Sequence, residues 1–132
     1  MTFKISDVID NLTFTVIKSS NIHGYGLFAT QFIAQGTPLG TLDGQIIPES
    51  LHSKFELTYE WNAIEVDTLL VRPYRTKYSY INHHRKPNLV LKGLPIVVTA
   101  LKDIQEGQEL TLDYRKENLS QTYIETTGKY YL

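Results

Sequence analysis

The chain contains no cysteine among its 132 residues. This absence excludes disulfide bonds, zinc sites built from thiolates and a cysteine nucleophile, and it fits a reducing compartment. The first residues lack the basic start and apolar run of a signal peptide, and no apolar run is long enough to cross a membrane. We therefore expect a cytoplasmic location and no membrane partner.

The chain also has little net charge: its acids and bases sum to −1 at pH 7. The chain as a whole is therefore not expected to bind nucleic acid directly by electrostatic attraction. Six acids and one base lie between Asp43 and Asp67, whereas six bases and no acid lie between Arg72 and Lys92. Two interpretations stay open: two solvated faces, or an acidic groove for a basic partner beside a basic wall for an anionic group.

Long helical patterns are missing as well. Most apolar runs are short, β-branched and bounded by glycine, proline, asparagine or aspartate, which predicts strands. The predicted strands are 13–18, 25–30, 38–47, 63–71, 88–91, 96–101 and 109–114. A turn at 104–109 suggests that residues 96–114 form a hairpin-like pair. One helix is predicted from Pro48 to about Leu57, and the tyrosine-rich tail 120–132 is interpreted as strand, coil or lid.

The segment 80–88 contains more hydrogen-bonding side chains than a proline turn needs. Taken alone, Asn82 is best explained as a turn cap and His83 as a satisfied core histidine. A metal ion shared by His83 and His84 is disfavoured, because adjacent residues on a strand point to opposite faces. No cysteine and no H-x-x-x-H pattern accompanies them. The sequence therefore predicts no metal site.

Two further segments could take part in a site. Gly24-Tyr25-Gly26 allows the backbone to approach a ligand closely, but taken alone it is better explained as a β-turn with no ligand. It is not a dinucleotide fingerprint, because the third glycine is missing. Tyr114 ends a predicted strand. It is either a strand-end tyrosine with a wet hydroxyl or a neutral hydroxyl at the bottom of a pocket, where it could orient an amine.

In this order, the three segments resemble the SET-domain family of protein lysine methyltransferases. Residues 23–29 resemble the family's G-x-G-L-F/V-A segment, residues 81–88 its x-N-H-S-x-x-P-N block, and residues 100–114 its A-x-x-x-I-x-x-G-E-E-L-x-x-x-Y block. The likeness runs from about residue 13 to 114. It implies a mostly β, SET-type β-clip fold of several short strands with a C-terminal pseudoknot. We expect a single domain over 1–132, with a variable insert at about 48–78 and an aromatic tail at 115–132.

The resemblance also implies which residues form the site. The cofactor would be S-adenosylmethionine, bound by His23, Gly24, Tyr25, Gly26, Tyr80, Asn82 and His83, with the Asn82 side chain and the His83 backbone as direct contacts. Tyr114 would be the catalytic tyrosine at the methyl-transfer channel. Leu42, Leu91 and Leu112 occupy positions that often add tyrosines to this channel, so the channel is expected to contain a single hydroxyl.

The implied activity is methyl transfer from this cofactor to a lysine of a basic protein or peptide. The alternative is a SET-like module that binds a partner or the cofactor without transferring methyl groups. The chain departs from the family pattern at His84, Gln108 and Arg115. Without cysteine, the zinc-binding tail that closes the site in many members cannot form. Tyr123, Tyr130 and Tyr131 are the aromatic residues left to cover the site, and a homodimer could complete it by analogy.

Overall fold

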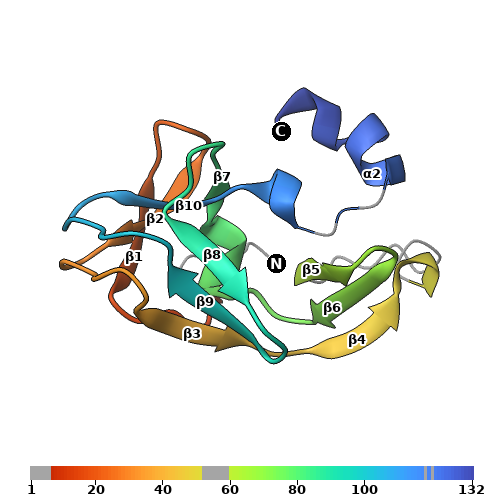
Figure 1. The fold of residues 1–132 in the computed structure, drawn as a ribbon, viewed down its shortest axis with the longest axis horizontal. Helices are drawn as coiled ribbons and strands as arrows, with labels where there is room; N and C mark the ends of the chain where they lie inside the picture. The colour runs from red at the N-terminus through yellow and green to blue at the C-terminus, as the bar shows by residue number, and fades with distance from the viewer. Residues whose placement is uncertain (1–6, 52–59, 118, 120) are drawn as a thin grey trace.

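The computed structural model describes residues 7–51, 60–117, 119 and 121–132, and three small β-sheets dominate it (Figure 1). The first sheet, in the order β1-β2-β10-β7, consists of Thr15–Ser19, Tyr25–Ala29, Glu109–Leu112 and Asn82–His83. The second, β3-β9-β8, consists of Pro38–Leu42, Ile96–Ala100 and Leu89–Lys92. The third, β4-β6-β5, consists of Gln45–Pro48, Thr68–Arg72 and Glu60–Glu65.

Short helices connect and cover these sheets. They are η2 (Lys77–Tyr80), η3 (Tyr114–Lys116), α2 (Gln121–Thr126) and η4 (Gly128–Tyr130). The C-terminal helices lie on the same side of the molecule as the third sheet (Figure 1). The expected fold class, mostly β with small sheets and few short helices, is confirmed.

Two hydrophobic cores hold the sheets. The larger core contains side chains from the first two sheets and the loops between them, including Leu27, Val98 and Leu110, all fully buried. The smaller core contains residues of the third sheet, with Trp61 and Leu119 packed against it. Burial of apolar area contributes about 25 cal/mol per Å², so both cores stabilise the fold. The smaller core also joins β5 to the C-terminal segment.

Two predicted strands each form two strands in the structure. The run 38–47 breaks at Asp43-Gly44, where Gly44 has φ +139° and an added Cβ would lie 2.3 Å from the Val71 carbonyl oxygen. The run 63–71 breaks at the turn before β6, where Asp67 has a φ of 67°. Aspartate tolerates this left-handed conformation better than most residues. The sequence pattern located the apolar stretches but not these reversals.

The expected hairpin-like pair over 96–114 is wrong. Strand β9 pairs with β3 and β8, whereas β10 pairs with β2 and β7 in a different sheet. The turn after Ile104 does form, but it leads from β9 in the second sheet to β10 in the first sheet. Ile104, just before this turn, forms an isolated bridge with Ile33. As a result, β10 lies between the glycine-containing strand β2 and the Asn-His strand β7.

The remaining predictions concern helices. Residues 49–51 are helical, and the rest of the helix predicted to end near Leu57 lies outside the described residues. The tail, interpreted as strand, coil or lid, forms the helices α2 and η4. None of the described helices is long or apolar enough to span a membrane.

Candidate functional site

The Asn82 side chain connects the three sequence motifs. Its Nδ2 lies 3.2 Å from the carbonyl oxygen of His23, 3.3 Å from that of Tyr25 and 2.8 Å from Glu109 Oε2. It also lies 3.2 Å from Ser20 Oγ. An amide nitrogen has two hydrogens to donate, and these acceptors share them. Asn82 is therefore not a simple turn cap, because its amide ties the loop before β2 to the first residue of β10.

Gly26 is required by Glu109. A Cβ atom at Gly26 would lie 2.3 Å from Glu109 Oε2. This carboxylate is held in place, because its Oε1 accepts a hydrogen bond of 2.6 Å from Ser20 Oγ and its Oε2 accepts one from Asn82. Gly24 differs, since it has a φ of +44° and an added Cβ would have no atom within 4 Å. The close approach predicted for this motif is thus made by a protein carboxylate at Gly26, while space is open beside Gly24.

Replacing Gly26 by alanine is expected to lower the free energy of unfolding by about 1–3 kcal/mol, because the new methyl group displaces a hydrogen-bonded carboxylate. Urea denaturation measures the change. In a Glu109→Ala background the same substitution should cost little, since the obstructing carboxylate is gone. An equal cost in both backgrounds would contradict the explanation.

The second asparagine of the motif also supports β10. Asn88 Nδ2 donates to the carbonyl oxygen of Glu109 at 2.8 Å, and Asn88 Oδ1 accepts from the N–H of Thr111 at 2.9 Å. His84 Nδ1 accepts the N–H of Lys86 at 2.9 Å, which closes the turn between the two asparagines. Within the described ranges, no group of three or more histidine, aspartate or glutamate side chains is placed to hold a metal ion.

Only one of the two ring nitrogens of His83 has a hydrogen-bond partner among the described residues, so His83 is not the fully satisfied core histidine that the segment alone suggested. Its Nδ1 accepts the N–H of Tyr114 at 3.0 Å, and its Nε2 is buried without a hydrogen-bond partner among the described residues. Burial lowers the pKa of His83, with the nearby Asp113 opposing this shift. A neutral ring that accepts at Nδ1 has its proton on Nε2. His83 therefore presents one unpartnered N–H donor.

Asp113 and Arg115 fix the start of η3 beside this histidine. Arg115 donates to Asp113 through Nε at 2.9 Å and Nη2 at 2.7 Å, and its backbone N–H donates to the same carboxylate at 3.0 Å. These bonds lower the pKa of Asp113 to about 2, so that it is ionised at neutral pH. The arginine that departs from the family pattern thus helps to orient the segment that begins with Tyr114.

Tyr114 lies at the junction of two pockets. Its hydroxyl donates a hydrogen bond to the carbonyl oxygen of Ile81. Burial raises the pKa of Tyr114, so the hydroxyl stays protonated at neutral pH. Its ring lies 6.1 Å from that of Tyr131, centroid to centroid, in an edge-to-face arrangement. A predicted strand-end tyrosine with a wet hydroxyl is not observed.

The first pocket, here called the His83 pocket, has a volume of about 490 Å³. It is lined by Ile22, His23, Asn82, His83, Tyr114 and Tyr131. Three predicted cofactor residues therefore border one cavity. Gly24, Gly26 and Tyr25 belong to the adjoining loop and strand, and the side chain of Tyr25 is 52% exposed. Tyr80 packs against the larger core instead.

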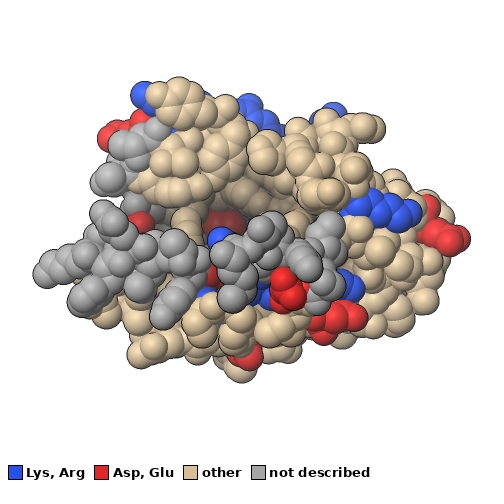
Figure 2. Space-filling model, turned by 180° about the vertical axis from the view of Figure 1, so that it is seen from behind, with Lys and Arg blue, Asp and Glu red and all other residues tan. Residues whose placement is uncertain are grey.

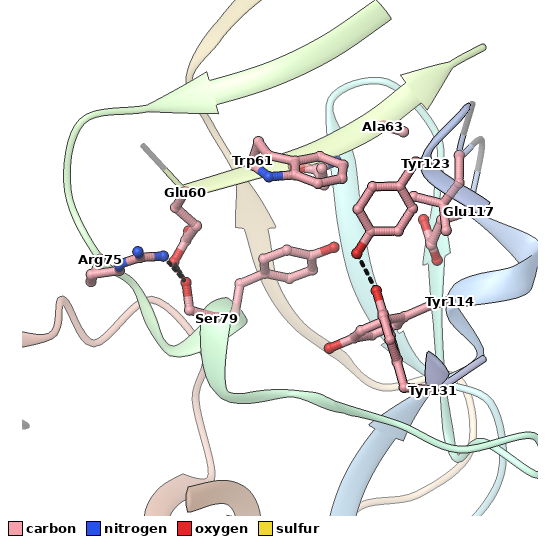
Figure 3. A pocket seen from close by; sticks show the side chains of 12 residues that line it. Glu60, Trp61, Ala63, Arg75, Ser79, Tyr114, Glu117, Tyr123 and Tyr131 are labelled. Carbon is pink, nitrogen blue, oxygen red and sulfur yellow. Dashed lines mark hydrogen bonds between the residues drawn. The ribbon is translucent and has the colours of Figure 1, made fainter. Parts of the chain in front are cut away.

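The second pocket, here called the Trp61 pocket, has a volume of about 370 Å³ and is rich in aromatic side chains (Figure 3). It is lined by Glu60, Trp61, Asn62, Ala63, Arg75, Tyr78, Ser79, Tyr114, Glu117, Leu119, Tyr123 and Tyr131. Trp61 and Tyr123 meet edge to face at 5.5 Å, and the hydroxyls of Tyr123 and Tyr131 are hydrogen-bonded to each other. Figure 2 shows the molecule hollowed near the centre of one face, with acidic and basic side chains inside.

The sequence predicted a channel with a single hydroxyl, whereas four tyrosines line the Trp61 pocket. Leu42 and Leu112 lie in the larger hydrophobic core, and Leu91 packs against it. None of these three leucines lines either pocket. Strands bury every second side chain, so Leu42 and Leu112 point into the core, whereas the partly buried Leu91 lines the neighbouring cavity that also contains Ala63 and Glu117.

Sequence reasoning missed several pocket residues. Trp61, Tyr78 and Glu117 line the Trp61 pocket but were not among the predicted site residues, although Trp61 is the only tryptophan of the chain. Ser20, which lines neither pocket but donates to Glu109, was not predicted either. Of the three tail tyrosines, Tyr123 and Tyr131 line the Trp61 pocket, whereas Tyr130 is 78% exposed. The available signal was the presence of aromatic residues in the insert at about 48–78 and in the C-terminal tail. Their spacing in the sequence could not show that the two groups line one pocket.

Glu60 lines one wall of the Trp61 pocket, and its buried ion pair with Arg72 connects the acidic and basic segments of the sequence. The Glu60 carboxylate accepts hydrogen bonds from Arg72 Nε, Ser79 Oγ and both the N–H and the hydroxyl of Thr76. Glu60 is 3% exposed and Arg72 is 1% exposed. Glu60 from the acidic segment and Arg72 from the basic segment therefore neutralise each other inside the protein. For this pair, neither two solvated faces nor an acidic groove beside a basic wall describes the structure.

The three motifs meet around one tyrosine that borders two pockets, which is the arrangement expected of a SET domain. Residues 24–115 match the family model described as SET domain. This match covers more than half of the chain, and the chain belongs to the SET-domain family.

Named relatives agree with this family. The putative histone-lysine N-methyltransferase 1 of Plasmodium falciparum (isolate 3D7) is 32% identical over 116 residues, covering 75% of this chain and 2% of the relative. The histone-lysine N-methyltransferase trithorax of Drosophila melanogaster is 32% identical over 110 residues, covering 73% of this chain and 3% of the relative. The chain thus spans only a few per cent of the length of these relatives.

Solved structures show the same fold. A humanized mutant of the Chaetomium thermophilum Polycomb Repressive Complex 2 bound to the inhibitor GSK126 superposes with a TM-score of 0.60 at 27% sequence identity. The superposition covers 76% of this chain and 14% of that chain.

Proposed function

We propose that this chain is an S-adenosylmethionine-dependent protein lysine N-methyltransferase. The observation that carries the proposal is that the His83 pocket and the Trp61 pocket share two lining residues, Tyr114 and Tyr131. A methyl transfer between two substrates needs two sites that meet at one point, so that the reacting atoms are aligned. Relatives named histone-lysine N-methyltransferases support a lysine-bearing protein as the acceptor.

The His83 pocket suits the cofactor. His83 lines this pocket and holds a buried N–H donor that has no partner among the described residues, and the adenine ring of S-adenosylmethionine has nitrogen atoms that accept hydrogen bonds. Beside this wall, an added Cβ at Gly24 would have no atom within 4 Å, which leaves room for a ligand to approach the loop backbone. His23, Gly24, Asn82 and His83 would hold the cofactor, which supplies an electrophilic methyl group on a sulfonium centre.

The residues of the chain prepare the acceptor amine. A free lysine amine has a pKa of about 10.4, so most of it is protonated at neutral pH. The positive sulfonium that a bound cofactor would place at the junction of the two pockets would disfavour an adjacent ammonium and lower that pKa. The Tyr114 hydroxyl and the Ile81 carbonyl, which are hydrogen-bonded to each other, place fixed polar atoms where the two pockets meet. We propose that they orient the neutral amine.

Exposed acids next to the Trp61 pocket would attract a basic peptide. Glu65 is exposed and lines a neighbouring cavity that shares Ala63 and Glu117 with the Trp61 pocket. Replacing Glu65 by lysine is expected to weaken binding of a basic peptide several-fold at low salt and less at high salt, because such attraction is screened. Fluorescence anisotropy of a labelled peptide at two salt concentrations measures the effect. Unchanged affinity at low salt would contradict it.

Mass spectrometry tests the proposed function. Purified protein is incubated with basic proteins and S-adenosylmethionine, and the products are digested and searched for lysines that have gained methyl groups. We expect methylated lysines that are absent when the cofactor is left out. If calorimetry shows cofactor binding but no protein in a broad library gains a methyl group, the chain is the binding module instead. If no cofactor binds, both assignments fail.

A further inference from the structure

The Trp61 pocket contains two carboxylates, and only one of them is neutralised inside the protein. Glu60 is saturated by Arg72, Thr76 and Ser79. In the described part of the chain, no side chain forms a hydrogen bond or an ion pair with the carboxylate of Glu117. Figure 3 shows Glu117 at the end of the pocket that carries Tyr114, Tyr123 and Tyr131, opposite to Glu60, Arg75 and Ser79.

We propose that Glu117, together with the aromatic walls of the Trp61 pocket, recognises an alkylammonium group, that of the substrate lysine. This inference rests on the proposed function and adds the residue that selects a cation. Rings of tryptophan and tyrosine attract cations through their faces, and a desolvated site strengthens this attraction. A carboxylate beside such rings supplies a charge-assisted hydrogen bond as well. The volume of about 370 Å³ lies within the range of small-ligand pockets.

None of the charged groups near Glu117 forms an ion pair with its carboxylate within the described part of the chain. Arg75 donates to Ser79 at the far end of the pocket. The titratable groups that line this pocket and the neighbouring cavity are Tyr114 and Lys116 on η3, Glu60 and Glu65 on β5, Arg75 and Tyr78 near η2, and Tyr123 and Tyr131 in the tail; the charge of Asp113 also acts on Glu117. Three of these tyrosines are neutral hydroxyls at pH 7, because burial raises the pKa of Tyr78, Tyr114 and Tyr131.

Burial, with a smaller effect of the charge on Asp113, raises the pKa of Glu117 to about 7. Glu117 is therefore protonated below pH 7 and ionised above it. An alkylammonium keeps its charge over this range, because its pKa is near 10. Preference for the cation should thus appear as the pH rises through about 7 and disappear as the pH falls.

The single tryptophan lines this pocket and reports its occupancy without any enzymatic activity. We would titrate the full chain at pH 8 with n-butylammonium, a mimic of the lysine side chain, and with neutral 1-butanol, and follow tryptophan fluorescence. We expect tighter binding of the cation. Glu117→Gln should reduce the preference at least about tenfold, as loss of a hydrogen bond to a charged group implies.

Glu106→Gln is the matched control, since Glu106 is an exposed acid in the turn before β10 and does not line the pocket. This variant should keep the preference of the wild type. If Glu117→Gln keeps it as well, or if the wild type prefers the cation equally at pH 5.5 and pH 8, the proposal is overturned. The pH comparison needs no variant, so a folding defect of Glu117→Gln would not protect the proposal.

Kinetics separate this proposal from the proposed function. On a lysine peptide, Glu117→Gln should raise KM about tenfold with little change in kcat, because the carboxylate recognises the ground-state cation. A fall in kcat at unchanged KM would count against it. If the wild type transfers no methyl group at all, the proposed function fails, while the fluorescence titration still decides whether Glu117 recognises alkylammonium.

Discussion

Replacing Tyr114 by phenylalanine is expected to reduce the rate of methyl transfer by about 100-fold, the usual cost of removing one aligned hydrogen-bond donor from a reacting centre. The substitution removes the hydroxyl that donates to the Ile81 carbonyl at the junction of the two pockets. The ring and its edge-to-face contact with Tyr131 remain. We therefore expect kcat to fall while cofactor affinity, measured by calorimetry, changes little.

Tyr130→Phe is the control for this experiment. It makes the same chemical change at a side chain that is 78% exposed, and it should transfer methyl groups at the wild-type rate. Comparison of the two variants by single-turnover kinetics separates the role of one hydroxyl from a general effect of losing a tyrosine. If Tyr114→Phe is as fast as Tyr130→Phe, the catalytic assignment of Tyr114 is wrong.

Replacing Arg72 by methionine is expected to lower the free energy of unfolding by about 3–5 kcal/mol, because it leaves a buried carboxylate without its counter-ion. The Arg72 side chain is fully buried; it contacts Glu60, the carbonyl oxygen of Asp43 at 2.7 Å and Asn62 Oδ1 at 3.2 Å. Its guanidinium carbon also lies 5.5 Å from the centre of the Tyr78 ring. Urea denaturation at pH 7 measures the loss.

Two further variants test the cause of this loss. Arg115→Met removes an arginine whose side chain is 41% exposed beside the buried Asp113, and because water reaches one partner of this pair, the loss should be smaller than for Arg72→Met. Adding Glu60→Gln to Arg72→Met should recover part of the stability, since the uncompensated charge is then removed. If Arg72→Met costs no more than Arg115→Met, the buried pair does not stabilise this wall of the Trp61 pocket.

Local sequence patterns were sufficient for most strands and for the order of the motifs. Short β-branched runs bury one face of a strand wherever they occur, and the observed strands lie within or beside the predicted runs, except for the two-residue strand β7. Turns were harder to predict. The break at Gly44 exists because the Val71 carbonyl lies against it, and Val71 is distant in the sequence. Likewise, the partner of β9 depends on which strand covers the core, not on the nearest turn.

For the site, the sequence by itself determined which residue types were available: a glycine loop, an Asn-His pair, a tyrosine after an acid, and no cysteine. Only the tertiary structure decided what these residues do. Insertion of β10 between β2 and β7 brings Asn82 to Glu109 and the loop at His23. Leu42 on β3 and Leu112 on β10 both lie in the larger core.

The lining of the Trp61 pocket depended on the tertiary structure even more strongly. Trp61, Glu117 and Tyr131 come from a strand edge and a C-terminal segment, and they meet only because the smaller core holds these parts together. Burial and charge at Glu117 follow from that packing. Composition and spacing record which side chains a chain contains; distance, burial and shared hydrogen bonds arise when segments far apart in sequence pack against each other.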